Sequence, residues 1–165
     1  MKRLTILLVI LAAAMWLLPG CGQKKAPEDF SFALAWNCNA DSRYDSATGK
    51  LVKTTHLTTH PEDYVTEYHL TEEERQQVWE LICDLDAESY PDQYDPGAGL
   101  AKPPLVLILT VRTAEGEKSI TAVAADYESD NAKGQRFLDT CRAIEELLTG
   151  TEAWQALPEC EFFYQ

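Results

Sequence analysis

The sequence predicts an α+β domain arranged as a two-layer sandwich, in which an antiparallel sheet of about five strands carries two helices on one face. Three observations predict it. Several segments show the two-residue alternation of strands, two segments show the periodicity of amphipathic helices, and the order of strands followed by a helix occurs twice. This repeated order is also typical of a duplicated ββα unit.

Five segments predict the strands. Residues 30–36 alternate large apolar with small side chains, as in a half-buried strand, and residues 64–70 alternate again. Residues 51–57 are rich in Thr and Val and follow a turn at 45–50, where Gly49 is free to take a positive φ. Residues 105–112 are continuously apolar, which predicts a central strand with both faces buried. A hairpin turn at 114–117 then leads into the strand at 118–124.

Two segments predict helices. Thr71 followed by Glu74 is a capping box, which marks the start of the first helix. The second helix is expected from residue 135 to residue 149, where Gly150 ends it, and Thr151 caps a last short turn. Apolar residues at helical spacing predict the buried stripes of the two helices: Val78, Leu81, Ile82 and Leu85 in the first, and Phe137, Cys141, Ile144 and Leu148 in the second.

The charge of the chain excludes one class of partner. The 165 residues carry a formal net charge of −13, and from Glu28 onward there are 10 basic and 27 acidic residues. Binding to phosphate backbones depends on clustered Lys and Arg, so nucleic acid is not an expected partner. The acidity favours solubility, or attraction of a cationic partner or of divalent ions.

The first 20 residues have the three parts of an export signal. Lys2 and Arg3 form a positive end, and an apolar run from residue 4 to residue 18 follows. This run of 15 residues is shorter than the roughly 20 residues of a membrane-spanning helix. The run ends in Leu18-Pro19-Gly20-Cys21.

These four residues resemble the lipobox of bacterial lipoproteins, with Pro19 at a position where Ala, Ser or Thr is usual. The resemblance covers the leader alone. It implies cleavage before Cys21, attachment of lipid to its thiol, and a protein held on the extracytoplasmic face of a membrane. The chain then divides into a signal peptide (1–20), a lipidated cysteine with a short linker (21–29) and one domain (30–165). An uncleaved anchor and an ordinary secreted protein are the alternatives.

Four cysteines follow Cys21, an even number that allows disulfides outside the cytoplasm. Cys38 and Cys160, both near strand or chain ends, are the candidate pair. Their long, irregular spacing contains no CxxC, so neither a metal nor another cofactor is expected.

No catalytic motif is present, and no residue is assigned a catalytic role. The loop at 89–104 contains Tyr90, Asp92, Tyr94 and Asp95 among prolines and glycines, which is typical of a recognition surface. The alternative is a crossover loop whose tyrosines pack on the sheet edge.

The sequence therefore favours a noncatalytic, membrane-tethered binding or accessory domain that acts on an envelope or secreted protein near the membrane. The linker of eight residues, Gly22 to Asp29, reaches about 28 Å at most. An envelope enzyme with an unfamiliar site and a solute-capturing lipoprotein are the alternatives, and the oligomeric state is left open.

Overall fold

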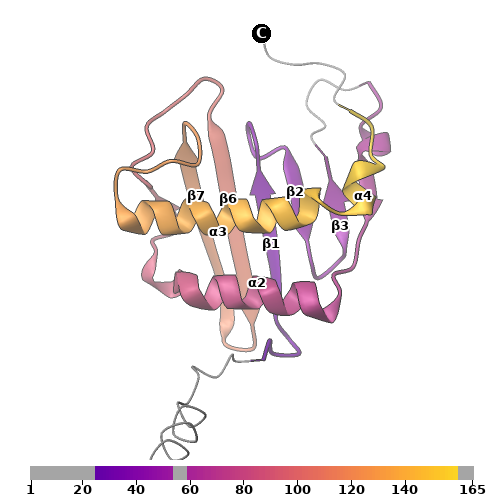
Figure 1. Ribbon diagram of the computed structural model, residues 1–165, viewed down its shortest axis with the longest axis horizontal. Coiled ribbons are helices and arrows are strands. Elements are labelled where there is room, and N and C mark those ends of the chain that lie inside the picture. The colour runs from indigo at the N-terminus through magenta and orange to yellow at the C-terminus, as the bar shows by residue number, and fades with distance from the viewer. Residues whose placement is uncertain (1–24, 54–58, 160–165) are drawn as a thin grey trace, which may run out of the picture.

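The computed structural model describes residues 25–53 and 59–159, which form one mixed sheet with its helices on one side (Figure 1). The sheet has seven strands in the order β4-β3-β2-β1-β6-β7-β5. All neighbouring strands are antiparallel except β5 and β7, which are parallel. The strands are β1 (Ser31–Trp36), β2 (Ser42–Asp45), β3 (Lys50–Val52), β4 (Val65–Glu67), β5 (Gln93–Tyr94), β6 (Leu105–Thr113) and β7 (Gly116–Ala124). The predicted α+β class with helices on one face of a sheet is confirmed.

The prediction of about five antiparallel strands is wrong in detail, because two short strands, β2 and β5, were not expected. β2 is four residues long and follows β1 through a tight turn in which Asn37, Asn39 and Ala40 have positive φ. The predicted turn at 45–50 therefore joins β2 to β3, and Gly49 has the expected positive φ of 73°. β5 is two residues long and lies inside the predicted loop. Strands this short give too few alternations to be recognised in a sequence.

The first helix agrees with the prediction. α2 (Glu72–Leu85) begins with the complete capping box of Thr71 and Glu74, and it buries Val78, Ile82 and Leu85. It ends at Asp86, which has left-handed backbone angles, and a short 3-10 helix, η2 (Ala87–Ser89), follows.

The second helix, α3 (Ala132–Thr149), begins three residues earlier than predicted. The reason is Asn131, whose side-chain oxygen accepts a hydrogen bond of 2.8 Å from the Gly134 amide and so caps the helix. Thr151 caps the short helix α4 (Glu152–Gln155), as expected. A second 3-10 helix, η1 (Pro61–Tyr64), precedes β4.

The core lies between the helices and the sheet. β1 contributes Phe32, Leu34 and Trp36, and α3 contributes the predicted stripe that includes Cys141; all are buried. β6 buries Leu107 and Leu109 in the same layer, whereas Val106 and Ile108 on its other side are only half-buried. The prediction that both faces of β6 are buried is therefore wrong, because helices cover one face alone.

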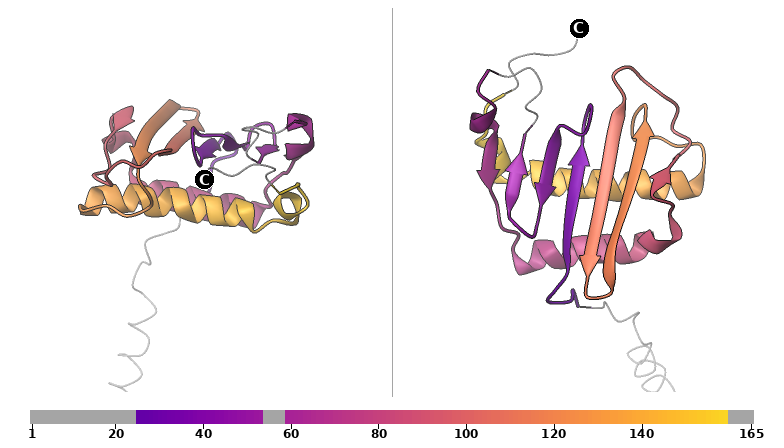
Figure 2. Two further views of the ribbon diagram at one scale, coloured as in Figure 1. Left: turned by 90° about the horizontal axis from the view of Figure 1, so that it is seen from above. Right: turned by 180° about the vertical axis from the view of Figure 1, so that it is seen from behind.

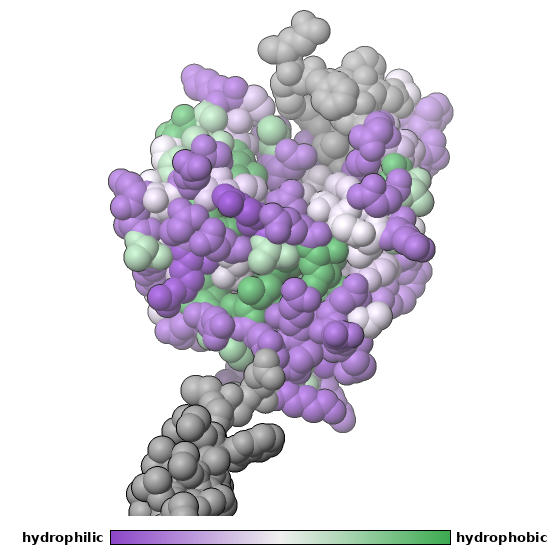
Figure 3. Space-filling model, in the orientation of Figure 1, coloured by the Kyte–Doolittle hydropathy of each residue, from purple (hydrophilic) through white to green (hydrophobic). Residues whose placement is uncertain are grey.

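The two faces of the domain differ. The helix-bearing face is mostly hydrophilic, with a band of hydrophobic surface between the helices (Figure 3). Among the described residues, no helix lies over the opposite face, which we call the open face (Figure 2). Among the helices of the described residues, none is long and apolar enough to cross a membrane.

Candidate functional site

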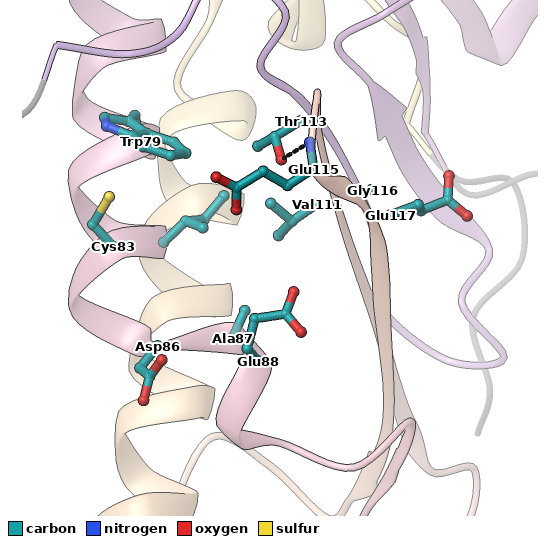
Figure 4. A pocket seen from close by; sticks show the side chains of 11 residues that line it. Trp79, Cys83, Asp86, Ala87, Glu88, Val111, Thr113, Glu115, Gly116 and Glu117 are labelled. Atoms are coloured by element: carbon teal, nitrogen blue, oxygen red, sulfur yellow. Dashed lines mark hydrogen bonds between the residues drawn. The ribbon is translucent and has the colours of Figure 1, made fainter.

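A cleft of about 520 Å³ lies where the C-terminal half of α2 meets the turn between β6 and β7 (Figure 4). We call it the acidic cleft. Its floor is apolar and its rim carries carboxylates. The lining residues are Trp79, Ile82, Cys83, Asp86, Ala87 and Glu88 from the α2–η2 segment, and Val111, Thr113, Glu115, Gly116 and Glu117 from the hairpin.

The floor of the acidic cleft is held rigidly by the core. Ile82 belongs to the buried stripe of α2, and Val111 packs against the core from β6. The Trp79 ring meets the Phe30 ring edge to face, with 4.9 Å between centroids. Because Phe30 itself is buried, the first residues of the domain hold this wall of the cleft in place.

Two carboxylates point into the acidic cleft. In Figure 4 the side chains of Glu88 and Glu115 are directed into the space between α2 and the hairpin, while Asp86 and Glu117 point away from it. Glu117 is engaged elsewhere, because it accepts a hydrogen bond of 2.8 Å from Arg112 Nε. Within residues 25–53 and 59–159, Glu88 and Glu115 have no ion pair or side-chain hydrogen bond.

Local backbone geometry explains why these two side chains meet. α2 ends at Asp86 with φ of 57°, which turns the chain into η2 and brings Glu88 over the cleft. On the other side, Gly116 has φ of 147°, which permits the tight turn of the hairpin. The Glu115 amide donates to the Thr113 hydroxyl at 3.3 Å, which fixes this turn (Figure 4).

The acidic cleft combines an apolar surface with two uncompensated negative charges. No group of three or more His, Cys, Asp or Glu within the described ranges is arranged to hold a metal. The chemistry that the cleft offers is therefore contact with an apolar group and attraction of a positive charge.

The groups with the most perturbed pKa values lie elsewhere. Burial raises the pKa of the fully buried Cys141 thiol and of the partly buried Tyr127 hydroxyl and Glu145 carboxyl. The Tyr127 hydroxyl donates a hydrogen bond to Glu145, and the Arg142 guanidinium lies 4.9 Å from the centroid of the Tyr127 ring. None of these residues lines the acidic cleft, so they serve the packing of α3 against the loop before it.

The residues of the predicted recognition loop lie in different environments. Tyr90 is 3% exposed, its hydroxyl donates to the Lys133 carbonyl oxygen at 3.0 Å, and its ring meets the Tyr94 ring edge to face at 4.9 Å. Asp92 accepts a hydrogen bond of 2.6 Å from Lys118, and Asp95 accepts one of 2.8 Å from the Gly97 amide. Tyr90 therefore belongs to the core at the sheet edge.

Tyr94 and Asp95 line a second, shallower hollow of about 560 Å³, beside Leu100. Leu100 is 80% exposed. Of the four residues that the sequence singles out in this loop, Tyr94 and Asp95 line this hollow, and a role in recognition remains a prediction for them.

Several predicted site residues lie outside the described ranges. They are Leu18, Pro19, Gly20 and Cys21 of the lipobox and Cys160 of the candidate disulfide. Cys38, its expected partner, is half-buried just after β1.

Sequence reasoning did not find the acidic cleft. Glu88 lies just before the predicted loop and in no predicted element, Glu115 lies in the predicted turn, and the two are 27 positions apart in the sequence. The turn at 114–117 was recognised, but nothing local indicated that it faces the end of α2.

Comparison of this chain with family models, with curated proteins and with solved structures finds no match.

Proposed function

We propose that this chain is a membrane-anchored lipoprotein whose domain is a noncatalytic binding module, and that its acidic cleft captures a basic amphipathic segment of an envelope or secreted protein. The observation that carries the proposal is the pair of uncompensated carboxylates, Glu88 and Glu115, directed into a cleft with an apolar floor.

Electrostatics favours a cationic partner at this site. The domain carries a formal charge of −17 from Glu28 onward, so its field attracts positive charge over long range. A Lys or Arg entering the cleft would pair with Glu88 or Glu115 without displacing an existing partner. An apolar side chain beside it would cover Ile82, Val111 and the Trp79 ring, which adds hydrophobic stabilisation.

The proposed tether would keep the acidic cleft near the membrane. The Ala26 amide donates to Gln76 Oε1 at 2.8 Å, and Arg75 donates to the carbonyl oxygens of Pro27, Glu28 and Phe30. The chain is therefore held against α2 from Ala26 onward. If Cys21 carries the lipid, the free linker is Gly22 to Lys25, with a reach of about 14 Å instead of about 28 Å.

The acidic cleft is in contact with the segment that is held against α2. Phe30, at the end of the held segment, packs on Trp79, which lines the cleft. Residues 25–30 and the β6–β7 turn lie at the same end of the domain (Figure 1). A partner of the cleft would thus be captured within a few nanometres of the membrane surface.

A titration tests the acidic cleft directly. The purified domain should bind an amphipathic peptide of lysine and leucine and should not bind the same peptide with glutamate in place of lysine. Each exposed ion pair contributes about 0.2–1 kcal/mol, so Glu88→Gln with Glu115→Gln should weaken binding roughly fivefold. Asp84→Asn with Glu73→Gln, exposed carboxylates of α2 outside the cleft, is the matched control. Equal binding of the two peptides, or a cleft variant that binds as tightly as the control, would refute the proposed cleft.

The anchor has its own test. Cys21→Ser should release the protein from the membrane fraction or leave an unprocessed precursor, whereas Cys38→Ser should behave as the wild type. Unchanged processing and membrane retention of the Cys21 variant would refute lipidation, whatever the outcome of the peptide titration.

A second candidate function is capture of a small cationic solute. Its support is the cleft volume of about 520 Å³, which lies within the range of small-molecule pockets, about 300–1,000 Å³. Titration with a polyamine in the same assay distinguishes this function from capture of a peptide.

We further propose the ββα duplication as the origin of the fold. β1 and β6 are antiparallel neighbours at the centre of the sheet, and each is followed by an antiparallel partner on its outer side. α2 and α3 cross the sheet in opposite directions (Figure 1). This arrangement is the one that two similar units related by a two-fold axis would have.

A further inference from the structure

The open face of the sheet carries a groove of about 300 Å³ along β1, on the side away from the helices. β1 places bulky Phe32, Leu34 and Trp36 in the core. Toward the open face it places Ala33 and Ala35, which line the groove. Because these side chains are small, the central strand forms a low floor between its neighbours.

The two walls of this groove differ in chemistry. On one side β6 presents Ile108 and Thr110, whose cross-strand partners on β1 are Ala35 and Ala33. On the other side β2 presents Arg43 and Asp45, and β3 presents Lys50, the cross-strand partner of Asp45. One wall is therefore largely apolar, and the other carries two cations and one carboxylate.

Arg43 is a cation whose neighbours on the adjacent strands are apolar. Its cross-strand partners are Ala35 on β1 and Val52 on β3. Within the part of the chain that the structure describes, neither Arg43 nor Lys50 makes an ion pair or side-chain hydrogen bond. Both side chains are exposed.

The carboxylate nearest to these cations is already engaged. Asp45 accepts hydrogen bonds from the Ala47 amide at 2.9 Å and from Arg112 Nη1 at 3.2 Å. Arg112 reaches Asp45 across β1 from β6, which the small side chains of β1 permit. Arg112 also donates to Glu117, so three cations (Arg43, Lys50 and Arg112) face two carboxylates (Asp45 and Glu117). One positive charge among these side chains is therefore uncompensated, although the domain as a whole is strongly acidic.

From this arrangement we infer that the groove on the open face binds an organic anion with an aliphatic body, such as a medium-chain carboxylate. The aliphatic body lies over Ala33, Ala35 and Ile108, and the carboxylate pairs with Arg43 and Lys50. The guanidinium of Arg43 can donate two parallel hydrogen bonds to a carboxylate. The volume of about 300 Å³ is at the lower end of the range for small-molecule pockets.

This site is independent of the acidic cleft. It lies on the opposite face, shares no lining residue with the cleft, and attracts the opposite charge. It also does not depend on lipidation of Cys21.

The test is a titration of the 15N-labelled domain with decanoate below its micellar concentration, with the neutral alcohol decanol as the head-group control. Decanoate should cause saturable shifts in the amides of β1, β2 and β6 beside the groove, and decanol should bind at least about fivefold more weakly. Arg43→Ala with Lys50→Ala should weaken decanoate binding roughly tenfold. Lys102→Ala, which removes an exposed cation outside the groove, should leave it unchanged.

Ala35→Leu is a second test variant, because the larger side chain fills the groove while every charge is retained. This variant should lose decanoate binding. Binding of decanoate and decanol with equal affinity would overturn the inference, as would full binding by the Arg43/Lys50 variant. A dimer that buries this face and shows no saturable decanoate binding would also overturn it, because a second copy would then be the occupant.

Discussion

Gly134→Ala should destabilise the domain, although helix propensity alone predicts that it stabilises α3. Gly134 lies in the first turn of α3, where alanine would ordinarily stabilise the helix by up to about 1 kcal/mol. In this fold the loop before β6 passes directly over it. An added Cβ would overlap the Pro96 carbonyl oxygen and the Ser129 hydroxyl, and would lie 2.9 Å from the Pro96 carbonyl carbon.

The cost follows from what must move. The Pro96 carbonyl oxygen accepts hydrogen bonds from the Ser129 hydroxyl and, at 3.1 Å, from Asn131 Nδ2, the residue that caps α3. Displacing Pro96 weakens both bonds, each worth about 1 kcal/mol, and overpacking adds about 1–3 kcal/mol. After the gain in helix propensity is subtracted, we expect a net loss of about 2 kcal/mol.

The measurements are urea unfolding and thermal unfolding of the purified domain, each followed by circular dichroism. A loss of about 2 kcal/mol corresponds to a fall in Tm of roughly 5–10 °C for a domain of this size. Ala132→Gly, an exposed position in the same turn, is the control and should cost only the propensity difference of about 1 kcal/mol. If Gly134→Ala is as stable as the wild type or more stable, the close approach of Pro96 to α3 is wrong.

Two further predictions concern α2. Burial of Glu74 opposes its ionisation, but hydrogen bonds from the Tyr68 hydroxyl at 2.7 Å and from the Thr71 amide at 2.8 Å outweigh this and lower the pKa of Glu74 below its ordinary value of 4.5. A carboxyl whose pKa is lowered on folding stabilises the domain above pH 4.5, and this contribution is lost as the pH falls through the pKa of the folded state. The free energy of unfolding of Glu74→Gln should therefore depend less on pH below 4.5 than that of the wild type. An equal pH dependence of the two proteins would contradict this prediction. Arg75→Ala removes the hydrogen bonds to three carbonyl oxygens and should lower the free energy of unfolding by about 1–3 kcal/mol. Hydrogen exchange should then accelerate at the Ala26 and Phe30 amides, and unchanged exchange there would show that Arg75 does not hold the segment.

Elements with strong local signals could be predicted from the sequence. The capping box of Thr71 and Glu74 and the stripe of α2 require only residues within one helix, and the β6–β7 hairpin requires only two strands joined by a tight turn. The short strands β2 and β5 could not be predicted, because their pairing depends on partners elsewhere in the chain. β5 pairs with β7, whose partner residues lie 28 positions later.

The acidic cleft could not be predicted from the sequence, and the recognition loop could be predicted only in part. The segment at 89–104 is mostly loop apart from β5 and the end of η2, but whether a tyrosine in it faces solvent or the core depends on Phe137, which comes from α3. Glu88 and Glu115 carry no signal in the sequence, since a charged residue in a turn is ordinary. They become a candidate site because the end of α2 and the β6–β7 turn meet in the folded domain.

By itself the sequence determined the class of the fold, the two helices with their buried stripes, and the strong acidity of the chain. These follow from local periodicity, capping and composition, which tertiary contacts leave unchanged. The tertiary structure alone decided the order of the strands, the uncovered face of the sheet, and which charges remain unpaired. The physical reason is that pairing and burial are properties of residues distant in the chain. Within the described residues Asp45 pairs with Arg112 and Arg43 makes no ion pair, and both outcomes depend on strand pairing that places β2, β1 and β6 side by side.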